Sequence, residues 1–287
     1  MDHIRKAILK AKAARRDGGH IPAPSVSRRE APRRHEPLSP TIPPEGSTRL
    51  LKSLDPALLE RNRIVAHLPH SPYTIGFDVL RTKVYQTMME RGWRTLVITS
   101  PTPDSGKTVT SINLAISLAR QPGCFTVLVD CDFRKPSIAR YLGLQFDADL
   151  HDVLSGRHAL VDAIEGLKIT GDGLGIIATR NAIARPSEVL SSPEMKGVVS
   201  AIKALSPDTL VIFDAPPMLI ADDVLAFLPE VDGVLLVVSP DWTNYSDTEA
   251  CLRNIPEEKL IGTVLARSNE RTEQSYYVNY KSLGRSR

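Results

Sequence analysis

The chain has 287 residues, of which 42% are hydrophobic and 24% are charged, and its formal net charge is +3 at pH 7. This length allows one α/β domain of about 200 residues with additional segments. The longest apolar run, Val234 to Val238, is far too short to span a bilayer, and the charged N-terminus lacks the apolar core of a signal peptide. We therefore expect a cytoplasmic protein.

The positive charge is concentrated in the first part of the chain. Residues 1–50 hold eleven Lys or Arg and five Asp or Glu, a net charge of +6, so residues 51–287 carry −3. Nucleic acid could bind such a segment, but no aromatic or RNA-binding signature accompanies it, and we expect none as a partner. A membrane surface or an acidic protein fits the charge equally well.

Residues 1–17 are predicted to form a basic amphipathic helix, because Ile4, Ala7, Ile8 and Ala11 recur at helical spacing. Its apolar face is small, so two interpretations are open: an isolated, frayed helix, or a helix that docks on a partner or an anionic membrane. Residues 18–49 are rich in Pro, Arg and Ser, which predicts a disordered linker.

The main domain is expected over residues 50–266. Residues 77–91 have the spacing of a packing helix, and residues 95–132 predict a strand, a loop, a helix and a second strand. Further strands are predicted at 173–179, 209–214, 233–239 and 260–266. Residues 136–165 predict interrupted helices, and further helices are predicted at 193–205 and 246–254. This alternation predicts an α/β fold of the P-loop NTPase type, with a mostly parallel sheet between helices on both faces.

The loop Ser105-Gly106-Lys107-Thr108 stands at the start of the helix and predicts a phosphate-binding site. The first N–H groups of a helix lack intrahelical partners and attract anions. We expect Lys107 to face solvent and reach the β- and γ-phosphates, and Thr108 to offer its hydroxyl to Mg²⁺. The loop departs from the usual pattern at Pro101 and Asp104. A chance match is the alternative, and the flanking strand and helix argue against it.

Carboxylates end two of the predicted strands. Asp130 and Asp132 stand two residues apart after the second strand, and Asp214 ends another buried apolar run. Ligands of open α/β sheets bind at this end of the strands, so these carboxylates predict a Mg²⁺ site beside the triphosphate. The alternative for Asp130 and Asp132 is an ordinary surface loop. Asp222 and Asp223 precede a helix, where N-capping is the favoured role.

Three motifs together resemble those of the bacterial tyrosine kinases (BY-kinases) of capsule and exopolysaccharide export. They are SPTPDSGKT, TVLVDCDFRKPS and LVIFDAPP, and the resemblance covers residues 80–265. The family shares its fold with the MinD and ParA ATPases. Those ATPases carry an extra lysine five residues before the main one, where this chain has Thr102, and this difference favours the kinase branch.

The resemblance implies ATP and Mg²⁺ as cofactors and assigns the site residues. Nucleotide binding falls to Asp104, Ser105, Gly106, Lys107, Thr108, Val109 and Arg134, with Arg134 steadying its loop. Metal binding falls to Thr108, Asp130 and Asp214, while Asp132 would orient or deprotonate the acceptor tyrosine. The catalytic set is then Lys107, Asp130, Asp132 and Asp214. The phosphoacceptors would be Tyr276, Tyr277 and Tyr280 of the tail, residues 267–287.

The resemblance also implies a setting. The partner would be a membrane chain-length-determinant protein, a polysaccharide co-polymerase, which would hold the kinase at the inner face of the cell membrane as a homo-oligomer. Two departures from the family pattern concern the subunit contact and the adenine site, and ordinary composition is the alternative for the sparse tyrosine tail. The family's subunit-contact motif, Glu-x-x-Arg-x-x-Arg, aligns with Ile75, Asp78 and Arg81, and an Asn near the base is replaced by Ala266. The alternatives are a ParA/MinD-type ATPase and a non-enzymatic ATP-binding adaptor of an export complex.

Overall fold

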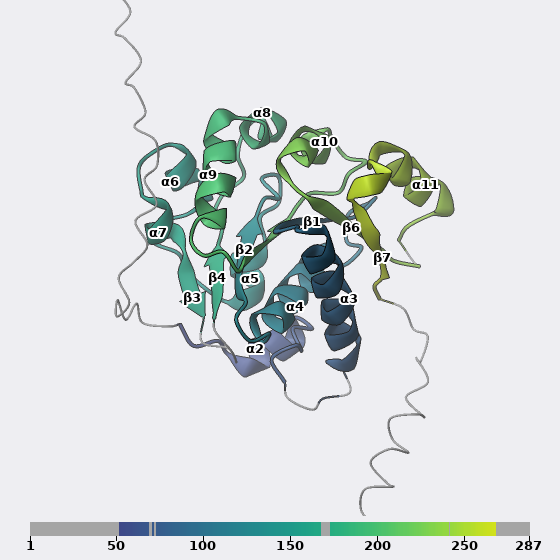
Figure 1. Ribbon diagram of the computed structural model, residues 1–287, viewed down its shortest axis with the longest axis horizontal. Helices are drawn as coiled ribbons and strands as arrows, with labels where there is room; N and C mark the ends of the chain where they lie inside the picture. The colour runs from purple at the N-terminus through teal and green to yellow at the C-terminus, as the bar shows by residue number, and fades with distance from the viewer. Residues whose placement is uncertain (1–51, 69–70, 72, 168–172, 241, 268–287) are drawn as a thin grey trace, which may run out of the picture. The chain divides into compact units, whose positions relative to one another are not determined.

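The computed structural model describes residues 52–68, 71, 73–167, 173–240 and 242–267 (Figure 1). These residues all lie within the unit formed by residues 38–287. The helix predicted at 1–17, the linker predicted at 18–49 and the tail tyrosines lie outside the described residues. Within the described part, no helix is long and apolar enough to cross a membrane.

A seven-stranded sheet organises the fold, with the strand order β3-β4-β2-β5-β1-β6-β7. Every neighbouring pair is parallel except β3 and β4. The mostly parallel sheet expected from the sequence is therefore confirmed, and the antiparallel edge strand β3 is an addition. The strands are β1 (Thr95–Thr99), β2 (Phe125–Asp130), β3 (Glu165–Leu167), β4 (Leu174–Ile177), β5 (Thr209–Asp214), β6 (Gly233–Val238) and β7 (Leu260–Leu265).

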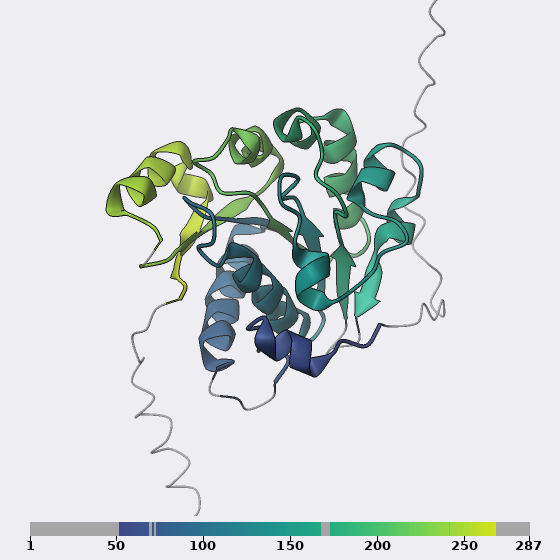
Figure 2. The ribbon, with the colours of Figure 1, turned by 180° about the vertical axis from the view of Figure 1, so that it is seen from behind.

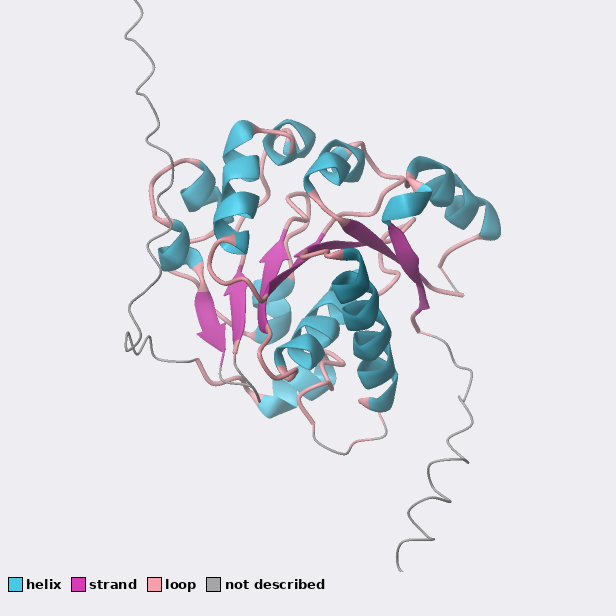
Figure 3. Ribbon diagram, in the orientation of Figure 1, coloured by secondary structure: helices cyan, strands magenta, loops and turns pink. Residues whose placement is uncertain are grey.

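Helices cover both faces of the sheet, as predicted (Figures 2 and 3). One face packs against α2 (Pro56–Arg61), α3 (Ile75–Arg91), α4 (Lys107–Ala119) and α5 (Ile138–Leu142). The other face packs against α6 (Leu150–Leu154), α7 (Leu160–Ala163), α8 (Pro186–Leu190), α9 (Pro193–Lys203), α10 (Asp223–Phe227) and α11 (Tyr245–Asn254). Two short 3₁₀ helices, η1 (Leu228–Glu230) and η2 (Glu257–Lys259), precede β6 and β7.

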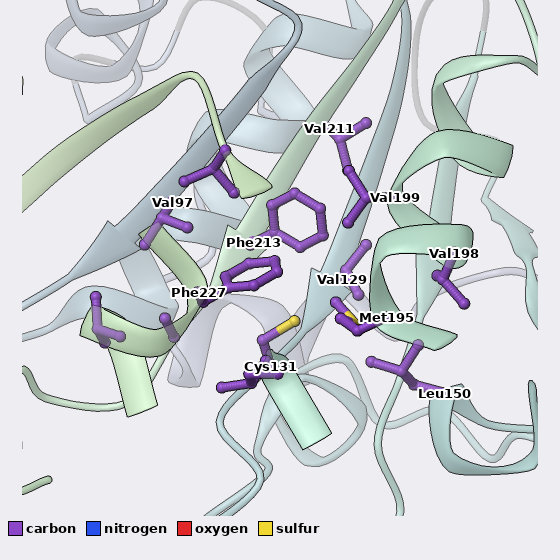
Figure 4. Close-up of a cluster of buried hydrophobic side chains, with 14 of the residues drawn as sticks. Val97, Val129, Cys131, Leu150, Met195, Val198, Val199, Val211, Phe213 and Phe227 are labelled. Carbon is purple, nitrogen blue, oxygen red and sulfur yellow. The ribbon is translucent and has the colours of Figure 1, made fainter. Parts of the chain in front are cut away.

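The central strands are buried on both faces, and their side chains alternate between the two cores. Val97 and Phe213 point to one core, whereas Ile98 and Ile212 point to the other. Phe213 also meets Phe227 of α10 edge to face, with ring centroids 5.0 Å apart (Figure 4). This contact packs α10, the first helix after β5, against the strand.

The register of the two central strands places two carboxylates side by side. β2 and β5 are paired from Phe125 and Thr209 to their last residues, Asp130 and Asp214. Both strands therefore end at the same level, next to the loop that follows β1. The sheet thus brings the predicted phosphate loop and the predicted carboxylates to one edge.

The two outermost strands differ in what lies beside them. At the β3 edge, Lys52 forms a parallel bridge with Leu167, and its amide donates to the carbonyl of Gly166 at 3.3 Å. The Lys52 ammonium also lies 3.4 Å from the Glu165 carboxylate. At the opposite edge, β7 pairs with β6 alone among the described strands. The described chain therefore begins at one edge of the sheet and ends at the other.

Candidate active site

The loop between β1 and α4 has the backbone geometry of a phosphate cradle. Gly106 precedes the helix with φ of 93°, a conformation that glycine adopts readily and other residues rarely do. A Cβ at this position would also lie 3.4 Å from Cβ of Ala266, at the end of β7. The amides of Lys107, Thr108 and Val109 then open α4 without intrahelical acceptors, so the helix offers donors for an anion.

Lys107 lines the pocket above this loop, but its side chain is buried, so the expectation that it faces solvent was wrong. Its Nζ donates to Oδ2 of Asp132 at 2.6 Å. Burial alone would lower the pKa of Lys107, yet the nearby carboxylates of Asp214 and Asp132 raise it above its ordinary value. The lysine is therefore a fixed cation that neutralises part of the carboxylate cluster.

Asp214 binds the start of α4 through two hydroxyl groups. Thr108 Oγ1 donates to its Oδ2 at 2.7 Å, and Ser111 Oγ donates to its Oδ1 at 3.0 Å. Asp214 is fully buried, and this burial raises its pKa despite the nearby Lys107. The strand carboxylate and the phosphate loop are thus held together without water between them.

Asp130 is fully buried beside Asp214 and is held by backbone amides. Its Oδ2 accepts from the amides of Ser137 at 2.9 Å and Ile138 at 3.0 Å, and its Oδ1 accepts from the amide of Asp132. Burial and the charge of Asp214 raise the pKa of Asp130 to about 8. Asp130 thereby folds the loop of residues 131–137, here called the A′ loop, back over the end of β2.

These residues fit a magnesium ion. Two adjacent buried carboxylates with raised pKa values mark a place where a further positive charge is favoured, and carboxylate and hydroxyl oxygens are ligands that Mg²⁺ prefers. Thr108, Asp130 and Asp214 would hold the ion, directly or through water. In the described part of the chain, no three acidic, histidine or cysteine side chains form a ready metal cage. Phosphate and water oxygens would complete the coordination, as is usual for Mg²⁺.

Most of the predicted nucleotide-binding residues line one pocket of about 200 Å³. Asp104, Gly106, Lys107, Thr108, Val109, Asp132 and Arg134 face it. Ser105, Asp130 and Asp214 lie behind this lining and are fully buried. The pocket is also lined by residues that were not predicted from the sequence: Pro103, Lys135, Ser137, Arg140, Tyr141, Pro217, Ile220 and Arg267. Among these residues, Ser137 could most readily have been predicted, because it stands in the same motif as Asp130, seven residues later.

Arg134 leaves the A′ loop toward α10 and forms an ion pair with Asp223. Its Nε donates to Oδ2 at 2.6 Å and its Nη2 donates to Oδ1 at 3.1 Å. The predicted N-capping role of the two aspartates is therefore wrong. Asp222 occupies the cap position, but its side chain accepts no capping hydrogen bond, and Asp223 binds Arg134 instead. The physical reason is that leaving a buried carboxylate without a cationic partner costs more free energy than leaving a helix end without a side-chain cap.

The loop after β4 also holds the A′ loop. Thr179 Oγ1 donates to the carbonyl of Asp130 at 2.7 Å, and the amide of Ile183 donates to the carbonyl of Phe133 at 2.9 Å. Lys135 closes the A′ loop from within, because its amide donates to Oδ1 of Asp132 at 3.0 Å. The segment that carries Asp132 is therefore supported from both sides.

The two departures from the BY-kinase pattern have structural counterparts. Asp78 is engaged within the chain by Arg81, Ser117 and Arg120, whose donors lie 3.3, 3.1 and 3.8 Å from its Oδ1. At the other position, the amide of Ala266 donates to the carbonyl of Val238. The family has an Asn at the position of Ala266. The next residue of this chain, Arg267, lines the pocket.

This fold and site define a P-loop nucleotide-binding protein. Residues 96–285 match the family described as the CobQ/CobB/MinD/ParA nucleotide binding domain, and the chain belongs to this family. It is 28% identical over 223 residues to "Tyrosine-protein kinase YwqD" of Bacillus subtilis, across 76% of this chain and 92% of that protein. It is 31% identical over 174 residues to "Putative tyrosine-protein kinase EpsB" of Ralstonia nicotianae, across 61% of this chain but only 22% of EpsB.

Solved structures agree with these relatives. The chimerical protein CapA2B2 matches with 26% identity and a TM-score of 0.66, over 72% of this chain and 90% of that one. The kinase domain of the Escherichia coli tyrosine kinase ETK matches with 25% identity and a TM-score of 0.62, over 72% and 82%. The resemblance to bacterial tyrosine kinases inferred from the motifs is therefore confirmed.

The buried carboxylates predict a specific dependence of stability on pH in protein free of nucleotide and metal. Asp130 changes from a pKa of 3.8 to about 8 on folding, so the folded protein keeps a proton that the unfolded chain releases. Its contribution to the free energy of unfolding therefore falls as pH rises between these values, by at most about 1.4 kcal/mol per pH unit. We predict that Asp130→Asn gains stability relative to the parent as pH rises from 5.5 to 7.5, measured by urea unfolding in a chelator.

Asp222→Asn is the matched control, because this carboxylate is exposed and its side chain makes no capping hydrogen bond. Its pH dependence should follow that of the parent. A constant difference in stability between Asp130→Asn and the parent across this range would contradict the assignment.

Proposed function

We propose that this chain is an ATP-dependent protein-tyrosine autokinase that regulates exopolysaccharide or capsule synthesis and export. The observation that carries the proposal is the cluster of Lys107, Asp132 and Asp214 at the end of the phosphate loop. It joins a phosphate-binding lysine, a pocket-facing carboxylate and a strand carboxylate in one site. Relatives with this fold are named tyrosine-protein kinases, among them EpsB and CapB.

The residues divide the work of phosphoryl transfer. The amides at the start of α4 and the Lys107 ammonium would hold the β- and γ-phosphates, and Thr108, Asp130 and Asp214 would hold Mg²⁺, which neutralises charge on the phosphates. The tyrosine oxygen forms a bond to the γ-phosphorus while the bond from that phosphorus to the β,γ-bridging oxygen breaks, and ADP leaves. The phenolic proton passes to Asp132, the carboxylate of the three that faces the pocket.

The pairing of Lys107 with Asp132 implies an order of events. While Lys107 donates to Asp132, the ammonium is not available to phosphate and this carboxylate oxygen is not available to the acceptor. Binding of the triphosphate would draw Lys107 toward the phosphates and free Asp132 for the acceptor. Nucleotide would therefore bind before the acceptor tyrosine.

We propose a membrane chain-length-determinant protein as the partner. Relatives carry names from polysaccharide systems, such as "Succinoglycan biosynthesis transport protein ExoP" of Rhizobium meliloti. The basic segment 1–17, joined through a proline-rich stretch, suits attachment to that partner or to the membrane beside it. The kinase would then act at the inner face of the membrane as a homo-oligomer.

A second candidate is an ATPase of the ParA/MinD type, which transfers phosphate to water. It is favoured by the family match, because MinD and ParA belong to the same family. Phosphotyrosine on the purified protein would support the kinase, whereas ADP release without phosphotyrosine would support the ATPase. Binding of ATP with neither product would indicate an adaptor.

We predict that Asp132→Asn separates nucleotide binding from phosphotransfer. The amide cannot hold Lys107 as an ion pair, so affinity for Mg·ATP should rise severalfold, measured by calorimetry. Autophosphorylation should fall by about 100-fold or more, because the acceptor loses its base. Equal loss of ATP binding and phosphotransfer would mean that the role assigned to Asp132 is wrong.

We predict that the tail is the acceptor and is labelled in another subunit. Changing Tyr276, Tyr277 and Tyr280 to Phe should remove most autophosphorylation and leave ATP binding unchanged. In a mixture with active protein, Lys107→Met protein should be labelled on its tail, as read by mass spectrometry. Circular dichroism checks its folding, because this substitution leaves the buried Asp132 unpaired. If the triple variant were autophosphorylated as strongly as the parent, the acceptor would lie elsewhere.

We predict that deletion of residues 1–17 spares ATP binding and weakens attachment to membranes that contain the partner. The deleted segment carries the net positive charge that an anionic surface attracts. Co-sedimentation with membrane vesicles measures the effect, and a variant with its Lys and Arg residues changed to Gln controls for length. Unchanged sedimentation of both would assign the segment to no attachment role.

A further inference from the structure

The ion pair between Arg134 and Asp223 joins a pocket residue to a buried one. The Asp223 side chain is 1% exposed, whereas that of Arg134 is 43% exposed. The two donors Nε and Nη2 meet the two carboxylate oxygens in a bidentate arrangement, which fixes the plane of the guanidinium. Asp223 therefore determines where Arg134 points.

Asp223 is itself held by the core. It is the first residue of α10, and Phe227 of the same helix packs edge to face on Phe213 of β5 (Figure 4). The residue after Phe213 is Asp214, which accepts from Thr108. Strand β5 thus places Asp214 beside the phosphate loop and, through α10, also positions Asp223, the partner of Arg134.

Arg134 lies close to the part of the pocket where transfer would take place. It follows Asp132 by two residues in the A′ loop, and both line the pocket together with Lys107. Since Lys107 contacts Asp132, this side of the pocket is the end that the terminal phosphate would approach. Arg134 is therefore placed with Asp132 and Lys107, at the end of the pocket that the terminal phosphate would approach.

The ion pair leaves part of the guanidinium unused. A guanidinium has five N–H donors, and the bonds to Asp223 use two of them. Within the described part of the chain, Nη1 donates no hydrogen bond to the protein. Three N–H donors are thus left for an oxyanion, held in advance on a rigid anchor, which is the arrangement that stabilises developing negative charge best.

We propose that Asp223 is a positioning residue that fixes Arg134 so that its free N–H groups bind the terminal phosphoryl group of the nucleotide. The inference deepens the proposed function and rests on it for the identity of the nucleotide. Arg134 distinguishes a triphosphate from a diphosphate, and Asp223 acts only through Arg134. A purely structural ion pair would instead stabilise α10 and affect both nucleotides alike.

The test compares the affinities of the full chain for Mg·ATP and Mg·ADP by calorimetry. Arg134→Gln should weaken ATP binding by about tenfold, the scale of one charge-assisted hydrogen bond, and leave ADP binding within about twofold. Asp223→Asn should weaken ATP binding selectively as well. The double variant should bind ATP no more weakly than Arg134→Gln, because Asp223 has no route of its own to the nucleotide.

Two further variants complete the design. Asp222→Asn changes the neighbouring exposed carboxylate and should match the parent for both nucleotides. Arg134→Lys keeps the charge but loses the bidentate geometry, so its ATP affinity should fall between those of Arg134→Gln and the parent. Thermal unfolding measures the stability of each variant. If Asp223→Asn is unstable, the variants of the partly exposed Arg134 still give the affinities for ATP and ADP.

Three results would overturn the proposal: parental ATP affinity in Arg134→Gln, equal loss of ATP and ADP affinity in Arg134→Gln or Asp223→Asn, or multiplied losses in the double variant. Failure of the proposed function is a separate outcome. If the parent binds ATP but forms no phosphotyrosine, the kinase assignment falls, while the ratio of ATP to ADP affinity still decides the role of Arg134.

Discussion

The charge balance of three carboxylates around one buried lysine governs the rest of this structure. Asp130, Asp132 and Asp214 meet at the ends of β2 and β5, and the ammonium of Lys107 lies near them and contacts Asp132. Burial raises the pKa values of Asp130 and Asp214, because the one buried lysine does not compensate for taking these carboxylates out of water. Such a site favours a divalent cation, and in the proposed function this ion would bind together with the phosphates of the nucleotide.

Neutral groups of the surrounding elements hold the cluster in place. Backbone amides hold Asp130, hydroxyl groups hold Asp214, and Thr179 supports the carbonyl of Asp130 from the loop after β4. These donors are neutral, so they fix the two carboxylates and the start of the A′ loop in place without supplying a full positive charge. Besides the ion pair of Asp132 with Lys107, the A′ loop forms one between Arg134 and Asp223, a carboxylate outside the cluster.

The sequence predicted those parts of the fold that depend on local pattern. Buried parallel strands are continuous apolar runs, so β5 was placed at its observed residues, 209–214, and its last carboxylate at the site. The three-residue strand β3 is too short for any periodicity to reveal it. The ion pairs were missed for another reason: Lys107 and Asp132 are 25 residues apart, Arg134 and Asp223 are 89 apart, and only the sheet brings them together.

The two edges of the sheet separate the ends of the described chain. Lys52 joins β3 beside Leu167, which pairs with the first residue of β4, whereas Arg267 follows the last residues of β7. Lys52 lies on the outer side of β3, so seven spacings of about 4.8 Å separate it from β7. These points are therefore roughly 34 Å apart across the sheet and lie at opposite ends of the strand direction. In the proposed kinase, a partner that bound the chain before Lys52 would therefore attach at the edge of the sheet opposite the one from which the chain leaves β7.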